Sequence, residues 1–136
     1  YPHSYAVGAT NGSDKAAYFS SRGPIKWEDV SYNKPDISAP GVGVLSAKPG
    51  GGYQKMSGTS MACPHVAGLV ALMLQANPSL NVKQVEDLLN SSAVDLGKDG
   101  LDNTYGHGRA DIKTTIDTIK GARNGQEEKF NSLFTE

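Results

Sequence analysis

The hydrophobic positions of this chain form short runs in its first half and longer helical patterns in its second half. SYAVGAT (4–10), AAYFSS (16–21) and GVGVLSA (41–47) are short runs of small, β-branched and aromatic residues bounded by Gly, Pro or Asn, and each predicts a strand. YQKMSG (53–58) predicts another short strand, and the three glycines before it predict a hairpin turn. Residues 25–34 show no clean period, which favours a surface excursion over a strand or helix.

The segment from Ser60 to Ala76 is apolar on nearly every side and predicts a buried helix. Pro64 lies inside this segment. Because only the first turn of a helix tolerates proline well, the helix is expected to begin close to Ser60.

Two further helices are predicted after this one. Asn81 and Gln84 have the spacing of a capping box at the start of the second helix. The third helix is expected to stop at Gly121, and residues 121–136 to form a polar, loosely held tail. The apolar residues expected to share one face are Val82, Val85 and Leu89 in the second helix and Ile112, Ile116 and Ile119 in the third.

Strands followed by a fully buried helix predict an α/β layered domain with a sheet covered on both faces. Three or four strands cannot surround a helix of this length, so the fold is expected to be incomplete. The chain opens at Tyr1 and Pro2 with neither an initiator Met nor a signal-like region, and we therefore expect it to be a piece of a longer protein.

Composition narrows the possible partners. The 136 residues carry a formal net charge of -1 with Lys and Arg scattered along the chain, which argues against nucleic acid and anionic membranes as partners. The longest apolar run, 66–74, is shorter than the roughly 18 residues that predict a membrane span. Cys63 is the one cysteine, so an internal disulfide is excluded, and it is interpreted as a small buried hydrophobe.

Ser60 lies between a Gly58–Thr59 turn and the helix start, where backbone N–H groups are unpaired and the helix dipole favours negative charge. If Ser60 Oγ attacked a carbonyl, its own N–H would lie beside the developing oxyanion. The alternative is that Ser60 or Thr59 caps the helix, and the pattern alone favours capping.

The string GTSMACPHVAG (58–68) resembles the nucleophile motif of the subtilisin family of serine proteases, the subtilases. Further blocks resemble the family in family order: YAVGAT, FSSRGP, DISAPGV and YGHGRAD. The resemblance is to bacillopeptidase F-like secreted bacterial members and covers residues 1–120. It implies a subtilisin-like layered α/β fold, with a mostly parallel sheet and helices on both faces. Residues 1–120 would be the C-terminal part of the catalytic domain.

The resemblance implies a serine endopeptidase that forms an acyl-enzyme on Ser60. The backbone N–H of Ser60 would be an oxyanion-hole donor, supported by Thr59. Met56, Ser57 and Gly58 would bind substrate on the leaving-group side. No residue matches the family's catalytic Asp, catalytic His or oxyanion Asn, which are expected from an upstream segment, so this chain alone is expected to be inactive.

Two other polar residues have a place in the resemblance. His65 lies five residues beyond Ser60, well round the helix, and is expected to be structural rather than the base. Asp36 with the carbonyls of Tyr1 and Ser4 matches a weak calcium or sodium site of some members, the alternative being a solvated or capping carboxylate. No cofactor is expected to be required.

The expected partners are peptide or protein substrates and the missing N-terminal half, with no nucleic acid and no membrane. Isolated, the chain is expected to dimerise or aggregate. The alternative function is an inactive structural fragment that binds its missing half, itself or another partner. The resemblance implies secretion from a bacterium, with an intracellular location as the alternative.

Overall fold

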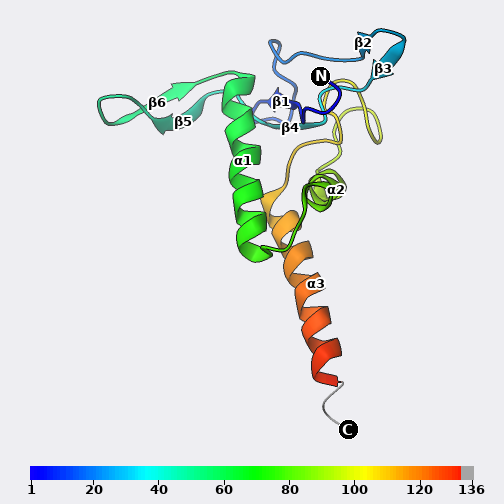
Figure 1. Cartoon of the computed structure of the whole chain (residues 1–136). Coiled ribbons are helices and arrows are strands. Elements are labelled where there is room, and N and C mark those ends of the chain that lie inside the picture. Colours follow the sequence, from blue (N-terminus) through cyan, green and yellow to red (C-terminus); the bar gives the residue numbers. More distant parts are fainter. Residues whose placement is uncertain (133–136) are drawn as a thin grey trace.

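The computed structural model describes residues 1–132, with side chains as far as residue 125. Strands gather at one end of the molecule, where α1 (Thr59–Ala76) begins (Figure 1). The other helices are α2 (Val82–Ser92), seen end-on in this view, and α3 (Ile112–Ser132), which extends away from the strands towards the C-terminus. The order β1 to β6 followed by α1 to α3 agrees with the α/β class expected from the sequence.

The central strands are β1 (Val7–Thr10) and β4 (Ile37–Pro40), which pair in parallel with Val7 opposite Ile37. The segment around Arg109 extends this pair, because Ser38 donates to the carbonyl of Gly108 at 2.8 Å and accepts from Ala110 N at 2.8 Å. The expected strand at 4–10 is confirmed as β1. Strand β4 was not expected, and its short run of small residues ends in proline.

The predicted strand at 16–21 is wrong. Ala16 forms only an isolated bridge with Thr10, and a turn follows in which Ser20 N donates to the carbonyl of Ala17 at 3.0 Å. The segment still covers β1, because Ser20 Oγ accepts from Ala9 N at 2.9 Å. A side-chain oxygen therefore takes the place of a ladder carbonyl at this edge.

Two antiparallel hairpins flank the central pair. Strands β5 (Val44–Ala47) and β6 (Tyr53–Met56) confirm the runs expected at 41–47 and 53–58, and their connecting glycines at 50–52 all have positive φ. Residues 25–34 were expected to contain no strand, and this prediction is wrong. They hold β2 (Ile25–Trp27) and β3 (Val30–Tyr32), where aromatic and β-branched residues pair across a tight turn.

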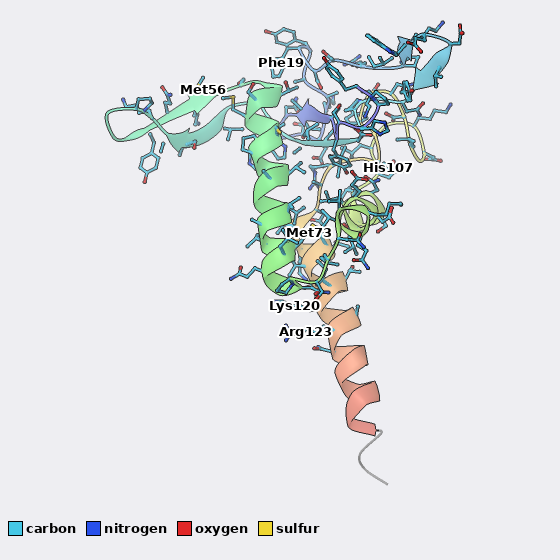
Figure 2. The ribbon with its side chains drawn as sticks, viewed as in Figure 1. Phe19, Met56, Met73, His107, Lys120 and Arg123 are labelled. Carbon is cyan, nitrogen blue, oxygen red and sulfur yellow. The ribbon has the colours of Figure 1, made fainter. Side chains whose placement is uncertain are left out.

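Helix α1 packs one face on β1, β4 and α3. Its buried residues are Ala62, Val66, Leu69 and Met73, the last of which is labelled on the lower part of the helix in Figure 2. The rest of the helix is more open within the described residues, with Leu72 43% and Leu74 40% exposed on either side of the buried face, so the expected burial holds for one face only. Cys63 is exposed, contrary to its interpretation as a buried hydrophobe.

By length and composition alone, α1 could also cross a membrane, and it is the one described helix of which this is true. The core helix of a soluble protein passes the same test, and α1 packs on two strands and on α3. The expectation of no membrane partner stays a prediction.

Helix α2 begins as expected. Asn81 Oδ1 accepts from Gln84 N at 2.9 Å and Gln84 Oε1 accepts from Asn81 N at 3.0 Å, which confirms the capping box. Val85 and Leu89 are buried, whereas Val82 is 76% exposed and does not belong to the packed face.

Helix α3 continues through Gly121 to Ser132, so the expected stop at Gly121 is wrong. Gly121 does not have the positive φ of a glycine that ends a helix. Ile119 is buried, Ile116 is partly buried and Ile112 is 49% exposed. Of the expected tail, residues 133–136 lie outside the described residues, and the domain boundary at residue 120 stays a prediction.

Candidate functional site

Ser60 is the second residue of α1, and a two-residue turn, Ser57 and Gly58, joins β6 to this helix. Two hydrogen bonds tie this turn to the segment that follows β4: Gly58 N donates to the carbonyl of Gly41 at 2.8 Å, and Ser57 Oγ accepts from Gly43 N at 2.8 Å. The end of the central strand pair therefore fixes where α1 begins.

Gly41 lets these elements approach each other closely. A Cβ added there would lie 2.7 Å from Ala9 Cβ and 2.7 Å from the carbonyl oxygen of Gly58, closer than real Cβ contacts allow. Ala62, fully buried in the first turns of α1, would lie 3.3 Å away. The missing side chain at Gly41 thus sets the distance between β4 and the serine-bearing turn.

The first turn of α1 leaves the N–H of Ser60 without a helical acceptor. Hydrogen bonding begins with Met61 N and Ala62 N, which donate to the carbonyl of Gly58 at 3.0 and 3.3 Å. The N-cap is Gly58 and no side chain caps the helix, so neither Ser60 nor Thr59 acts as the N-cap. The unpaired N–H and the helix dipole together favour an oxyanion beside Ser60.

Two depressions adjoin this turn. Ser60 is exposed and lines one of about 320 Å³ between the start of α1 and β5, together with Val44, Leu45, Ser46, Met61, Pro64 and His65. Thr59 lines a second one, also of about 320 Å³, whose other walls include Tyr1, Pro2 and residues of the β2–β3 hairpin. A small group can therefore reach Ser60 Oγ from solvent.

The residues expected on the leaving-group side lie directly before Ser60. Met56 ends β6 and is 48% exposed, and Figure 2 shows it beside the first turn of α1. Ser57 and Gly58 make the two bonds that hold the turn. The five expected residues, 56 to 60, thus run from the end of β6 through the turn into the first turn of α1.

His65 shares the depression with Ser60 but is tied to its own helix. Its Nδ1 lies 2.8 Å from the carbonyl oxygen of Met61. Because a carbonyl can only accept, Nδ1 carries the hydrogen in this bond. Among the described side chains, none hydrogen-bonds to Ser60 Oγ, so these residues do not supply the base that a nucleophilic serine requires.

The three oxygens of the expected cation site already accept hydrogen bonds. The carbonyl of Tyr1 accepts from Ser4 N at 3.3 Å and from Ser4 Oγ at 2.8 Å. The carbonyl of Ser4 accepts from Lys34 Nζ at 2.7 Å, and Asp36 Oδ2 accepts from the same Nζ at 2.7 Å. A bound metal ion would have to displace the ammonium, so the residues present do not fit one.

Sequence reasoning missed Lys34. Lys34 and Asp36 are two residues apart in KPD, and residues i and i+2 of an extended segment project to the same side. That spacing was the available signal for the pair. The contact of Lys34 with Ser4 had no such signal, because the two residues lie 30 positions apart.

The acidic loop 95–103 binds its own backbone. Asp95 Oδ2 accepts from Gly100 N at 2.7 Å, and Asp102 Oδ1 accepts from the N–H groups of Thr104 and Tyr105, each at 2.7 Å. The described residues contain no group of three acidic, His or Cys side chains placed to hold a metal ion.

The described residues thus place an exposed serine, which does not cap the helix, in the first turn of a helix that packs on a parallel strand pair. The chain belongs to the subtilase family, whose model matches residues 1–108. This confirms the resemblance on which the expected fold and site residues were based.

Comparisons with individual proteins give the same family. The chain is 42% identical over 130 residues to bacillopeptidase F of Bacillus subtilis, covering 92% of this chain and 9% of the relative. It is 42% identical over 113 residues to subtilisin E of Bacillus subtilis, covering 83% of this chain and 26% of the relative. The solved CspB protease of Clostridium perfringens matches with a TM-score of 0.73 at 28% identity, covering 85% of this chain and 26% of that one. The chain thus spans about a quarter or less of these relatives.

Proposed function

We propose that the protein carrying this chain is a serine endopeptidase that forms an acyl-enzyme on Ser60. The observation that carries the proposal is that Ser60 is exposed in the first turn of α1 without capping it, and that its own N–H has no acceptor among the described residues. Family membership supports the same reading, since the relatives include subtilisins. The catalytic Asp, the catalytic His and the oxyanion Asn come from a segment preceding residue 1.

The turn provides two parts of the chemistry. Ser60 Oγ attacks the carbonyl carbon of the scissile peptide while its proton passes to the imidazole of the upstream segment. The oxygen that becomes negative accepts from the N–H of Ser60, with Thr59 supporting that hole. The C–N bond then breaks, the amine leaves along Met56 to Gly58 with the proton from the imidazole, and water hydrolyses the ester to regenerate Ser60.

The finer features of the proposal follow from the family. The substrates are peptides or proteins, the enzyme requires no cofactor for the chemical step, and its location is extracellular, as for secreted bacterial subtilases. The competing function is an inactive fragment that serves only to bind its other half or another partner.

Fluorophosphonate labelling of the whole protein separates the two functions. We expect one label, mapped by mass spectrometry to the peptide containing Ser60, and peptide hydrolysis that is lost with it. Ser60→Ala should abolish both, whereas the matched control Ser91→Ala, an exposed serine of α2, should retain both. Label that persists in Ser60→Ala would refute the assignment. A whole protein that neither labels nor cleaves peptides would favour the inactive fragment.

A further inference from the structure

The ammonium of Lys34 lies at the centre of a small polar cluster that joins the N-terminal segment to the start of β4. It donates to the carbonyl of Ser4 and to Asp36 Oδ2, both at 2.7 Å. The side chains of Lys34 and Asp36 are only 14% and 27% exposed. A pair this shielded is screened less by water and salt than a surface ion pair.

Asp36 is held in place from three directions. Its Oδ2 also accepts from Ala6 N at 2.6 Å, and its backbone carbonyl accepts from His107 N at 2.9 Å. Gly106 packs so closely that an added Cβ would lie 2.3 Å from that carbonyl oxygen. The main chain of Asp36 is therefore fixed by His107 and Gly106, and its carboxylate is held by Ala6 N and Lys34 Nζ.

The oxygens that Lys34 contacts are the kind that bind hard cations, one main-chain carbonyl and one carboxylate. They are also two of the three oxygens that the sequence resemblance assigned to a weak cation site. We propose that the Lys34 ammonium is a built-in cation at this place, which joins residues 4–6 to residue 36 without a bound metal ion. The proposal does not depend on the catalytic chemistry.

This cluster also forms part of a wall beside Thr59, the residue before Ser60. Ser4, Lys34 and Pro35 line the same depression as Thr59. Because the Lys34 ammonium is covalently attached, it keeps this wall in place whatever salts surround the protein.

The test uses the whole protein in a Ser60→Ala background, which removes self-digestion. Thermal midpoints are measured in choline chloride and in NaCl or CaCl₂ of equal ionic strength. The variants are Lys34→Ala, its matched control Lys26→Ala on the exposed strand β2, Asp36→Asn, and the Lys34→Ala/Asp36→Asn double variant.

In choline chloride, Lys34→Ala should lower the midpoint by about 5 °C relative to Lys26→Ala, because the carboxylate and the Ser4 carbonyl lose their shared donor. NaCl or CaCl₂ should restore part of that loss in Lys34→Ala but none in the double variant. NaCl or CaCl₂ should change the thermal midpoint of the parent by the same amount as that of Asp36→Asn, since any other cation sites contribute equally to both.

Two results would overturn the proposal. If Asp36→Asn removes part of the parent's response to NaCl or CaCl₂, a metal ion binds there beside Lys34. If Lys34→Ala folds but NaCl and CaCl₂ raise its thermal midpoint no more than that of the double variant, this place is not a cation site. Should Lys34→Ala fold only in NaCl or CaCl₂, the proposal is supported. If Lys34→Ala folds in neither salt, the change in thermal midpoint with NaCl or CaCl₂ is compared between the parent and Asp36→Asn. Equal changes support the proposal, and a smaller change in Asp36→Asn overturns it.

Discussion

At the scale of one residue, the position of Ser60 depends on Gly41, because glycine has no Cβ to keep the start of α1 away from the strand pair. The carbonyl of Gly41 accepts from Gly58 N at 2.8 Å, and a Cβ at Gly41 would overlap both Ala9 and Gly58. Any side chain at this position must therefore push the start of α1 away from the strand pair.

We predict that Gly41→Ala destabilises the whole protein by about 1–3 kcal/mol, the usual cost of overpacking a close contact. It should also slow fluorophosphonate labelling of Ser60, because the turn moves. The control is Gly12→Ala, where an added Cβ meets nothing within 4 Å. Urea unfolding and labelling rates measure both effects. Equal behaviour of the two variants would show that the close approach does not set the position of the turn.

Tyr5 gives a prediction on pH. Burial, and then the carboxylates of Asp36 and Glu86, raise the pKa of the Tyr5 hydroxyl, which donates to Asn90 Oδ1 at 2.6 Å. The folded state thus keeps this proton at a pH where the unfolded state has lost it. The stabilisation is complete below pH 10.0, the ordinary pKa of tyrosine, and is lost as the pH rises from there towards the raised pKa.

Urea midpoints measured from pH 8 to 11 should therefore fall above about pH 10. Tyr5→Phe should lower stability by about 1 kcal/mol at neutral pH, through the lost hydrogen bond, and should flatten the alkaline decline. Tyr18→Phe, at a side chain that is 95% exposed, serves as the control and should change neither. A decline as steep in Tyr5→Phe as in the parent would count against this role.

At the scale of elements, α3 offers a direct test of where a helix ends. Gly121 lies inside α3 without a positive φ, and an added Cβ meets nothing within 4 Å. Gly121→Ala should therefore stabilise the protein by up to about 1 kcal/mol, the helix-propensity difference between the two residues. If the helix ended at Gly121 in a left-handed conformation, the same change would destabilise it by a similar amount. The thermal midpoint distinguishes the two signs.

A contrasting variant is Gly100→Ala. Its added Cβ also meets nothing within 4 Å, but the residue has a φ of 77°. Alanine is strained in that conformation, so this substitution should lower the thermal midpoint although it creates no clash.

The elements that sequence patterns predicted well are those whose signals are local. The capping box of Asn81 and Gln84 and the glycine turn of the β5–β6 hairpin each lie within a few residues, and both are confirmed. Strand β4 was missed because its sequence, ISAP, has one β-branched residue followed by small residues and a proline, which give no local strand pattern. Residues 16–21 were misassigned because the segment bonds to β1 only briefly, through Ala17 N to the carbonyl of Ala9 and through Ser20 Oγ, and then turns.

The candidate site follows the same rule. Met56 to Ser60 are consecutive, so their closeness in space follows directly from the sequence. The role of Gly41 and the contact of Lys34 with Ser4 depend on how separate segments pack, and pattern reasoning did not find them.

At the scale of the whole molecule, the described residues leave much apolar surface uncovered. On α1, Leu72 and Leu74 are each at least 40% exposed, and the described residues hold only short two-stranded sheets. Burying such surface contributes about 25 cal/mol per Å², so contact with further protein is strongly favoured.

We predict that residues 1–136 alone are neither monomeric nor active. Sedimentation should show a dimer, an aggregate or, on mixing, a complex with the remaining part of the domain. Peptide hydrolysis should stay near background until that part is added, because Ser60 has no base among the described side chains. A monomer of the isolated chain that cleaves peptides, with activity lost in Ser60→Ala, would show that the base is local.

The covalent attachment of Lys34 has a consequence for how the protein responds to dilution. A free ion leaves its site when its bulk concentration falls below the dissociation constant, whereas a tethered group has an effective concentration fixed by the chain. Only one residue, Pro35, lies between Lys34 and Asp36 in the chain. Neither a chelator nor transfer to ion-poor water can therefore remove this charge, and the contact between residues 4 and 34 persists in media that would empty a metal site.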